Sequence, residues 1–522
     1  MISSTCPRRM VNCFGASFLL VIAWKFILLL VTAQPIPAND AFGYDGPVVN
    51  YLLNGHYCNP SLLIPFPFSA TQVFCIYPPL YQAVLFLWMS VFGPTVLAAM
   101  WFHFVLFGLY ALTLLAIFRR LQTPARAVNL AGLFLLGITF DDRPDGLAQL
   151  LGMLAVYAWV RSVQPPGRSR WPWLAALLVV LTLCINPEIG VIYFGLVWLL
   201  TLGAAGRKHH FPVVPMGFML VAPVALVALV KHGRPDLWAG FMEHAGQTPS
   251  FTGLRRPAVG DLIKLVRNIP AILLIAVLLP KWFKPLFTVA PADRSTESPA
   301  VLLVFSTVLI ALGWVAGGLF LFTANWILFL AQWQPLLVGA FLTLVQRREP
   351  AMKRWLSPVL AALVLLVSVR AVGMATWGVA CSLDVNQGAA GQLVRAELDR
   401  APLGSTVVMS SAYLYEAMKH PGRMYLHEDW IHANRPDDPS VKLNGDTVAL
   451  LSLKPAALIL TQFDYYRRYQ IPLAQLGAMP DRVAFRITNT ARLPSPDSHP
   501  HFQQVVQHVS WAPVLVEFDW KR

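Results

Sequence analysis

One carboxylate stands alone in the segment AFGYDGPVVNYLLNGHY, residues 41–57. Asp45 is its only charged side chain, and the segment follows the first long apolar run of the chain. A solitary carboxylate can act as a general base that takes the proton from an attacking hydroxyl. It can equally well cap a helix, because Asp is a preferred N-cap residue and Pro47 suits the first helical turn. The sequence leaves both roles open for Asp45.

A second polar group stands in FDDRPDG, residues 140–146, which brings three carboxylates and one guanidinium together between two apolar runs. Charged groups at a membrane are costly where they face lipid, so they line a cavity or protrude into water. Two carboxylates can hold a divalent cation, although no spacing rule specifies one here. A solvated turn that caps the following helix is the alternative.

The composition shows what kind of protein surrounds these groups. Hydrophobic residues make up 56% of the 522 residues and charged residues only 13%, whereas soluble domains are about one-quarter charged. The basic residues give a net charge of +14 but sit mostly in short segments between apolar runs. No zinc spacing, Walker loop or recognition-helix pattern occurs. The sequence therefore predicts a multi-span membrane protein with no nucleic-acid partner.

Eleven apolar stretches are candidates for crossing the lipid bilayer. They are residues 11–33, 95–118, 127–140, 146–161, 172–186, 188–203, 211–230, 269–283, 300–322, 326–345 and 356–380. With the N-terminus in the cytoplasm, seventeen Lys and Arg residues lie inside and seven outside before residue 381, as the positive-inside rule requires. We therefore expect about 11 transmembrane helices and an external C-terminal region. Cleavage of a signal peptide after Val31-Thr32-Ala33 is an alternative that would leave ten spans.

The pattern changes after residue 380. The segments STVVMSS (405–411) and PAALILTQ (455–462) have the pattern of buried strands, and NQGAAGQLVRAELDR (386–400) has helical spacing. We expect residues 1–380 to form a transmembrane catalytic domain that includes a first external loop at 34–94. Residues 381–522 are expected to form an extracytoplasmic α/β domain. Two cysteines of the 34–94 loop, Cys58 and Cys75, either form a disulfide or stay free.

The order of several motifs resembles the GT-C class of membrane glycosyltransferases. The motifs are an external Asp45 after the first span, a helix ending at Gly55, Pro78-Pro79-Leu80, Phe92-Gly93, and RPDGLAQLLGMLAVYAWV at 143–160. The resemblance covers roughly residues 10–210 in motif order and the whole chain in architecture. Within the class, the chain is most similar to the group of protein O-mannosyltransferases and aminoarabinose transferases of lipid A.

This resemblance implies an inverting transfer of a sugar from a polyprenyl-phosphate donor to a hydroxyl of a glycan, lipid or protein. The reaction would take place on the extracytoplasmic face of the inner (plasma) membrane. The family position gives Asp45 the role of catalytic base, Asp145 a role in supporting the acceptor or a metal, and Arg143 a contact with the donor phosphate. A phosphate leaving group needs little protonation, so one carboxylate suffices where ordinary glycosidases use two.

The chain departs from the family at three places. Gly46 follows Asp45 where many relatives have an acidic pair, and Tyr77 precedes the Pro-Pro-Leu motif where many have Lys. Asn186-Pro187-Glu188 occupies a turn where a positive charge is common. These differences leave the donor sugar and any need for a divalent cation open.

Six basic residues gather in the long external loop at 231–268. Phosphate recognition favours Arg, because its guanidinium offers paired donors. Arg255 and Arg256 are therefore candidates for binding the lipid phosphate. Attraction to anionic lipid headgroups is the alternative for most of the six.

A membrane transporter or lipid flippase is the alternative from another functional class. Transporters often carry internal repeats and charged residues at the bilayer midplane. This chain shows no convincing repeat between its halves, and its acidic residues gather at one membrane face. The sequence therefore favours a GT-C type glycosyltransferase with Asp45 as the base.

Overall fold

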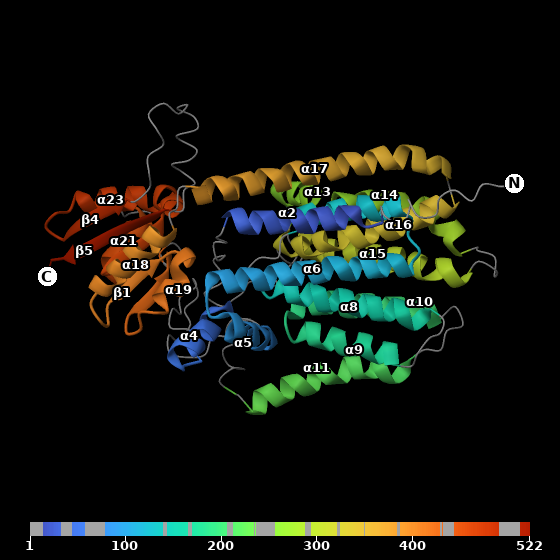
Figure 1. Cartoon of the computed structure of the whole chain (residues 1–522), viewed down its shortest axis with the longest axis horizontal. Coiled ribbons are helices and arrows are strands. Elements are labelled where there is room, and N and C mark those ends of the chain that lie inside the picture. The colour runs from blue at the N-terminus through green and yellow to red at the C-terminus, as the bar shows by residue number, and fades with distance from the viewer. Residues whose placement is uncertain are drawn as a thin grey trace.

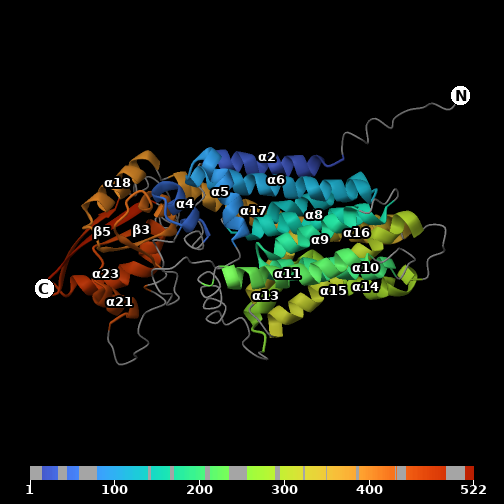
Figure 2. The ribbon, with the colours of Figure 1, turned by 90° about the horizontal axis from the view of Figure 1, so that it is seen from below.

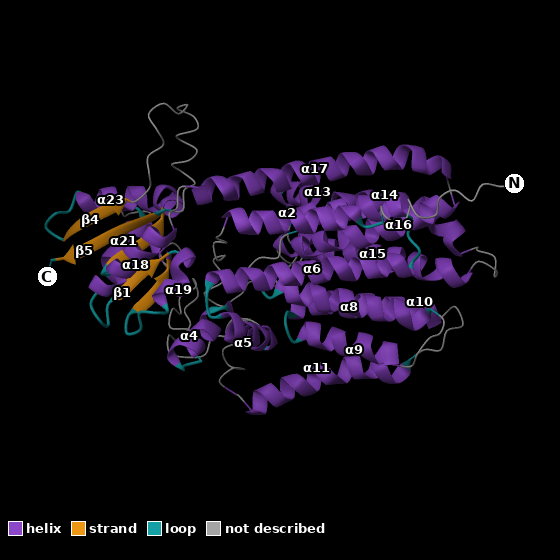
Figure 3. Ribbon diagram, in the orientation of Figure 1, coloured by secondary structure: helices purple, strands orange, loops and turns teal. Residues whose placement is uncertain are grey.

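The computed structural model shows a bundle of apolar helices with a small α/β domain at one end (Figure 1). The described residues are 14–32, 44–57, 79–138, 143–164, 170–205, 212–233, 235, 256–287, 294–320, 324–348, 350–383, 387–428, 431, 443–489 and 512–521. Within them, every strand lies C-terminal to residue 405, and the orange arrows of Figure 3 gather at one end of the molecule.

The bundle helices run side by side along the long axis of the molecule (Figure 1). They are α2 (Ala16–Thr32), α6 (Val96–Arg120), α7 (Ala125–Leu133) with η1 (Phe134–Gly137), α8 (Asp145–Val163), α9 (Arg170–Leu183), α10 (Pro187–Ala205), α11 (Val213–Gly233), α14 (Pro270–Phe287), α15 (Arg294–Phe320), η3 (Ala324–Trp333) with α16 (Gln334–Arg348), and α17 (Pro350–Leu383). A helix thus lies in each of the eleven stretches that the sequence predicts as spans.

Length and apolarity identify the helices that suit a membrane. Among the described residues, six helices are long and apolar enough to cross it, or seven if the bent pair α13 and α14 counts as one span. Five further apolar helices are shorter. The structure therefore confirms a helical membrane protein, while about eleven crossings stay a prediction.

A polar cluster stabilises the sharp bend between α13 (Val259–Asn268) and α14, whose axes differ by 89°. Gln334 on α16 donates to the Asn268 carbonyl at 2.8 Å and accepts from the Ala271 N–H at 3.1 Å. Arg370 on α17 donates to Asn268 Oδ1 at 2.6 Å. Backbone groups freed at a break in an apolar setting need such partners. Arg370, the one basic residue within the last predicted span, thus stabilises the bend between α13 and α14.

Two short helices lie at the end of the bundle, between it and the C-terminal domain (Figures 1 and 2). These are α4 (Gly46–Asn54) and α5 (Leu80–Phe92). One side of α5 is buried through Tyr81 and Leu85, whereas Leu87 and Val91 are 65% and 75% exposed. An apolar side chain exposed in this way suits a helix that lies along a membrane interface.

The C-terminal domain is a five-stranded sheet covered by helices on both faces. Its strands are β1 (Thr406–Met409), β2 (Met424–His427), β3 (Ala457–Thr461), β4 (Val483–Asn489) and β5 (Pro513–Trp520), in the order β2-β1-β3-β5-β4. Strands β1, β2 and β3 are parallel, and β5 is antiparallel to β3 and β4. Parallel strands buried on both faces read as continuous apolar runs, which is why β1 and β3 could be predicted.

The two faces of the sheet belong to different cores. Helix α18 (Gln387–Arg400) covers one face through Val394 and Leu398, while α21 (Gly445–Leu453) and α23 (Gln470–Gly477) cover the other. The core under α18 also includes Tyr81 of α5 and continues through the bundle. The C-terminal domain is therefore packed onto the membrane domain through shared apolar contacts.

Helices α8 and α10 approach each other closely at Gly152. A Cβ atom at Gly152 would lie 2.2 Å from the ring of Tyr193. That ring is fully buried, and its hydroxyl donates to Gln149 Oε1 at 2.8 Å. Close helix contacts in membranes rest on such small residues. The packing here therefore leaves no room for a methyl group.

We predict that Gly152→Ala destabilises the protein by about 1–3 kcal/mol, the usual cost of overpacking. Gly313→Ala in α15 is the matched control, because a Cβ there meets nothing within 4 Å. Thermal unfolding of the two purified variants in detergent measures the difference. Equal melting temperatures for both variants and the wild-type protein would contradict the proposed packing.

Candidate active site

Asp45 occupies the N-cap position of α4, but its side chain does not cap the helix. The backbone has φ −92° and ψ −31°, and the side chain makes no capping hydrogen bond. Pro47 lies in the first turn, as the sequence predicts. The carboxylate is fully buried. Capping therefore does not explain why a carboxylate stands here.

Two tyrosine hydroxyls bind the Asp45 carboxylate, one to each oxygen. Tyr81 of α5 donates to Oδ1 at 3.3 Å. Tyr415, which lies on α19 (Leu414–Ala417) of the C-terminal domain, donates to Oδ2 at 2.9 Å. Both tyrosines are themselves buried. Three segments that are far apart in the sequence thus meet at one carboxylate.

A histidine from the bundle continues this group. The Tyr81 hydroxyl lies 3.3 Å from His103 Nε2 on α6, and the two rings stack with centroids 6.3 Å apart. A tyrosine hydroxyl has one proton and can also accept. When Tyr81 donates to Asp45, its oxygen accepts from the Nε2–H tautomer of His103. This polar path runs from the carboxylate into the membrane domain.

Burial dominates the electrostatics of the carboxylate. It raises the pKa of Asp45 from its ordinary range to about 7, while the hydrogen bonds from Tyr415 and Tyr81 lower that pKa. The hydroxyls favour the charged form and burial disfavours it. No cation among the described residues forms an ion pair with Asp45. A carboxylate with a pKa near 7 is well matched to accepting a proton at neutral pH.

The second predicted group forms around the start of α8. Arg143 Nε lies 3.3 Å from Asp145 Oδ2 in an ion pair. Asn186 donates from Nδ2 to Asp145 Oδ1 at 2.7 Å, and its own Oδ1 accepts from the N–H groups of Glu188 and Ile189 at 3.0 and 3.2 Å. Asn186 therefore caps α10 and ties its start to that of α8. The side chain of Asp145 retains 16% exposure and that of Arg143 37%.

The group around Asp45 and the group around Asp145 lie at the same end of the bundle. Helices α6 and α8 both begin at the end that faces the C-terminal domain (Figure 1), and the bond from Asn186 to Asp145 brings the start of α10 there. Among the described residues, no hydrogen bond or ion pair joins Asp45 to Asp145 or Arg143. Arg256 is exposed just before α13. Among the described residues, the structure thus joins Arg143 to Asp145 and shows no direct bond from that pair to Asp45 or Arg256.

Several predicted residues fall outside the part of the chain that the structure describes. They are Cys58, Cys75, Tyr77, Asp141, Asp142 and Arg255. Within the described part, no group of three or more His, Cys, Asp or Glu side chains is arranged to hold a metal ion. The roles of the FDDRPDG carboxylates therefore stay predictions.

The sequence analysis singled out neither of the two tyrosines that bind Asp45, nor His103. Tyr415 follows β1, and the carboxyl ends of parallel strands commonly carry functional side chains. That position is the signal that could have singled it out. Tyr81 lies on the apolar helix next to the Pro-Pro-Leu motif, where only its burial and the contact with Asp45 reveal its role.

Comparison with known proteins gives similarity at the level of fold. Neither protein-family models nor curated proteins match the sequence. The structure is similar to that of ArnT from Cupriavidus metallidurans bound to undecaprenyl phosphate, with a TM-score of 0.50, 15% identity, and coverage of 96% of this chain and 98% of that one. The apo state of the same protein gives a TM-score of 0.51 and 14% identity, covering 95% and 97% of the two chains.

A mycobacterial enzyme shares the same architecture over part of its length. The arabinofuranosyltransferase AftD from Mycobacteria gives a TM-score of 0.50 and 13% identity over 99% of this chain, which spans 40% of AftD. Both comparison proteins are GT-C glycosyltransferases. The chain therefore has the GT-C fold that the sequence resemblance indicates.

Proposed function

We propose that this protein is a glycosyltransferase that moves a sugar from a polyprenyl-phosphate donor to a hydroxyl of a glycan, lipid or protein acceptor. The observation that carries the proposal is Asp45, a buried carboxylate with a pKa near 7 and two hydroxyl donors, at the end of a GT-C bundle. The fold adds support, because the ArnT structure carries undecaprenyl phosphate.

The reaction that suits this group is a direct displacement. The acceptor oxygen attacks the anomeric carbon, its proton passes to Asp45, and the phosphate leaves with the electrons of the broken C–O bond. One substitution at the anomeric carbon inverts its configuration. Among the described residues, Asp45 is the only carboxylate in the cluster that it forms with Tyr81 and Tyr415. The phosphate leaving group needs no second carboxyl group to protonate it. The geometry therefore matches a one-base mechanism.

Two basic side chains that solvent reaches are candidates for the donor phosphate. Arg143 is partly exposed beside Asp145, and Arg256 is exposed at the start of α13. An Arg guanidinium can bind two phosphate oxygens at once. We assign Arg143, Arg255 and Arg256 to the donor phosphate and Asp145 to the acceptor side or to a divalent cation.

The proposal also fixes a topology. Residues 1–380 would form the transmembrane catalytic domain, with about eleven crossings of the inner (plasma) membrane. Residues 381–522 would lie on the extracytoplasmic side, together with Asp45. The contact between Tyr415 and Asp45 requires the α/β domain and the base to share one side of the membrane.

We predict that Asp45→Asn leaves a folded protein with transfer lowered about 10²–10⁴-fold, the usual contribution of a general base. The Asn oxygen still accepts a hydrogen bond from one tyrosine and its NH2 group can donate to the other, but the side chain takes no proton from the acceptor. The first measurement is the mass of the envelope glycans in cells that lack the chain, express it or express the variant. The second is transfer by purified protein in lipid from a panel of undecaprenyl-phosphate sugars.

The matched control is Asp519→Asn, which changes an exposed carboxylate on β5. We expect normal glycan masses and transfer rates from that variant. Near-normal transfer by Asp45→Asn would show that the carboxylate is not the base. Glycan masses that are identical with and without the chain, and no transfer from any donor, would reject the glycosyltransferase.

The topology is tested with a reporter enzyme that is active only outside the cytoplasm. We expect activity from fusions after residue 385 and none from fusions near residues 122, 165 or 350, because the basic residues next to those sites favour the cytoplasm. The measurement is reporter activity normalised to the amount of fusion protein. Activity at 350 without activity at 385 would overturn the orientation.

A further inference from the structure

The C-terminal domain reaches the candidate base through α19. Tyr415 donates to Asp45 Oδ2 at 2.9 Å and is 3% exposed. In a second hydrogen bond the donor is on the α4 side, because Asn54 at the end of α4 donates to the Met418 carbonyl at 3.1 Å. The two contacts hold both ends of α4 against the segment around α19.

We propose that Tyr415 is a positioning residue for Asp45, so that the C-terminal domain completes the active site of the membrane domain. This inference rests on the proposed function, in which Asp45 takes the proton of the acceptor. Tyr415 would hold Oδ2 from the domain side while Tyr81 holds Oδ1 from the bundle side. Each oxygen keeps a second lone pair for the acceptor hydroxyl.

The hydroxyl also sets the charge state of the base. Among the described residues, the carboxylate accepts hydrogen bonds from Tyr81 on α5 and Tyr415 on α19, and His103 on α6 contacts Tyr81. Since Asp45 forms no ion pair within the described part of the chain, its hydrogen bonds are the interactions seen there that oppose burial and favour the ionised form. Removal of the Tyr415 hydroxyl therefore raises the pKa of Asp45 above its value of about 7.

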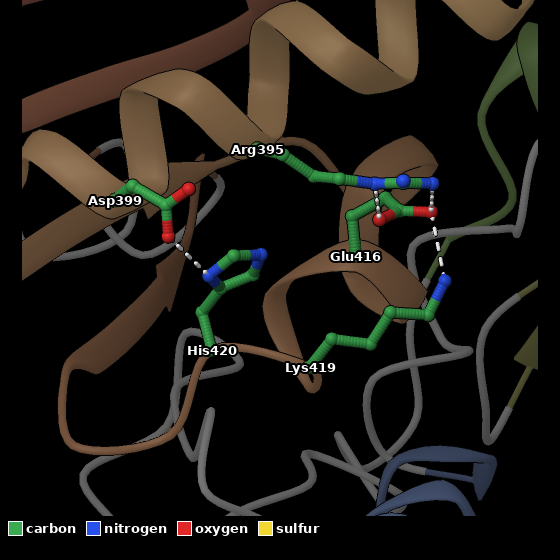
Figure 4. A network of polar contacts seen from close by, with 5 residues as sticks. All are labelled: Arg395, Asp399, Glu416, Lys419 and His420. Atoms are coloured by element: carbon green, nitrogen blue, oxygen red, sulfur yellow. Dashed lines mark hydrogen bonds and ion pairs between the residues drawn. The ribbon is translucent and has the colours of Figure 1, made fainter.

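A cluster of ion pairs holds α19 in place (Figure 4). Glu416, next to Tyr415, binds Arg395 of α18 through Nε at 2.7 Å and Nη2 at 3.3 Å, and it binds Lys419 Nζ at 3.0 Å. His420 Nδ1 lies 3.0 Å from Asp399 Oδ1, also on α18. Single exposed ion pairs contribute little, but a bidentate Arg contact fixes orientation.

The cluster explains how a four-residue helix can place a hydroxyl accurately. Burial raises the pKa of Glu416, but the hydrogen bonds and charges of Arg395 and Lys419 outweigh it, so the net pKa is below the ordinary value. Glu416 therefore stays ionised at neutral pH and bound to α18. Since α18 is packed on the sheet through Val394 and Leu398, α19 is fixed to the body of the domain.

The test is Tyr415→Phe, which keeps the ring and removes the hydroxyl. Infrared difference spectroscopy of the purified protein follows the carboxylic acid band of Asp45 as the pH changes, with Asp45→Asn identifying that band. A hydrogen bond to a charged group corresponds to a shift of about one to two pH units. We expect the midpoint to rise by that amount, and transfer at pH 7 to fall about five- to fifty-fold and to recover at higher pH.

Tyr425→Phe is the matched control, because it removes another buried hydroxyl of the domain that donates to the His420 carbonyl and not to Asp45. We expect its Asp45 midpoint to equal that of the wild-type protein. If Tyr415→Phe does not fold, Glu416→Gln carries the test. It frees α19 from its ion pairs while the hydroxyl stays, and we expect a smaller rise of the midpoint.

An unchanged midpoint in folded Tyr415→Phe, or in Glu416→Gln where that variant is needed, would overturn the inference. The infrared titration needs no sugar donor, so its result is separate from that of the proposed function. Full transfer by Asp45→Asn would remove the base assignment but leave the titration intact. Loss of transfer in Tyr415→Phe at every pH, with an unshifted midpoint, would mean that the residue is only structural.

Discussion

A buried carboxylate that forms no ion pair with a cation of the described residues is the constraint on which the site depends. Asp45 has two hydroxyl donors as partners, and they come from the two sides of the junction between the bundle and the C-terminal domain. Burying a charge is costly unless its hydrogen bonds are satisfied. The two tyrosines reduce that cost enough to keep the pKa of Asp45 near 7. A lysine or arginine in their place would hold the carboxylate charged and make it a poor base.

The architecture follows from placing this group at one end of the helical bundle. Helix α4 begins directly after Asp45, and Tyr81 lies on α5 beside the start of the bundle helix that carries His103. The C-terminal sheet completes the arrangement, because the chain runs from β1 through the short 3-10 helix η4 (Ser411–Tyr413) to Tyr415. A shared apolar core joins these parts. The domain is therefore part of the site in this structure rather than an appendage beside it.

Local patterns in the sequence predicted much of this. The apolar stretches become helices, STVVMSS and PAALILTQ contain β1 and β3, and residues 386–400 contain α18. These features depend on length and periodicity within one segment, which a sequence shows directly. Asp45 could be singled out for a similar reason, since a lone carboxylate beside a membrane-length helix is conspicuous. The local pattern also placed it correctly before α4 but did not show whether its side chain caps the helix.

The partners of Asp45 could not be predicted, because they depend on tertiary packing. Tyr415 is 370 positions away along the chain, and no local periodicity encodes that pairing. His103 is buried in the bundle, and only its contact with Tyr81 gives it a place in the site. The partner of Arg370 is likewise distant, because Asn268 lies 102 positions away along the chain.

The most direct test of the account is the pH dependence of transfer by the wild-type protein. With purified protein in lipid and a donor that supports transfer, kcat/KM reports the ionisation of the free enzyme. Asp45 must be ionised to accept a proton, so we predict that kcat/KM rises with pH and reaches half its maximum near pH 7, the pKa set by burial and the two hydroxyls. A rate that is constant from about pH 5 to 8, or that falls as Asp45 ionises, would contradict the role of this carboxylate as the base.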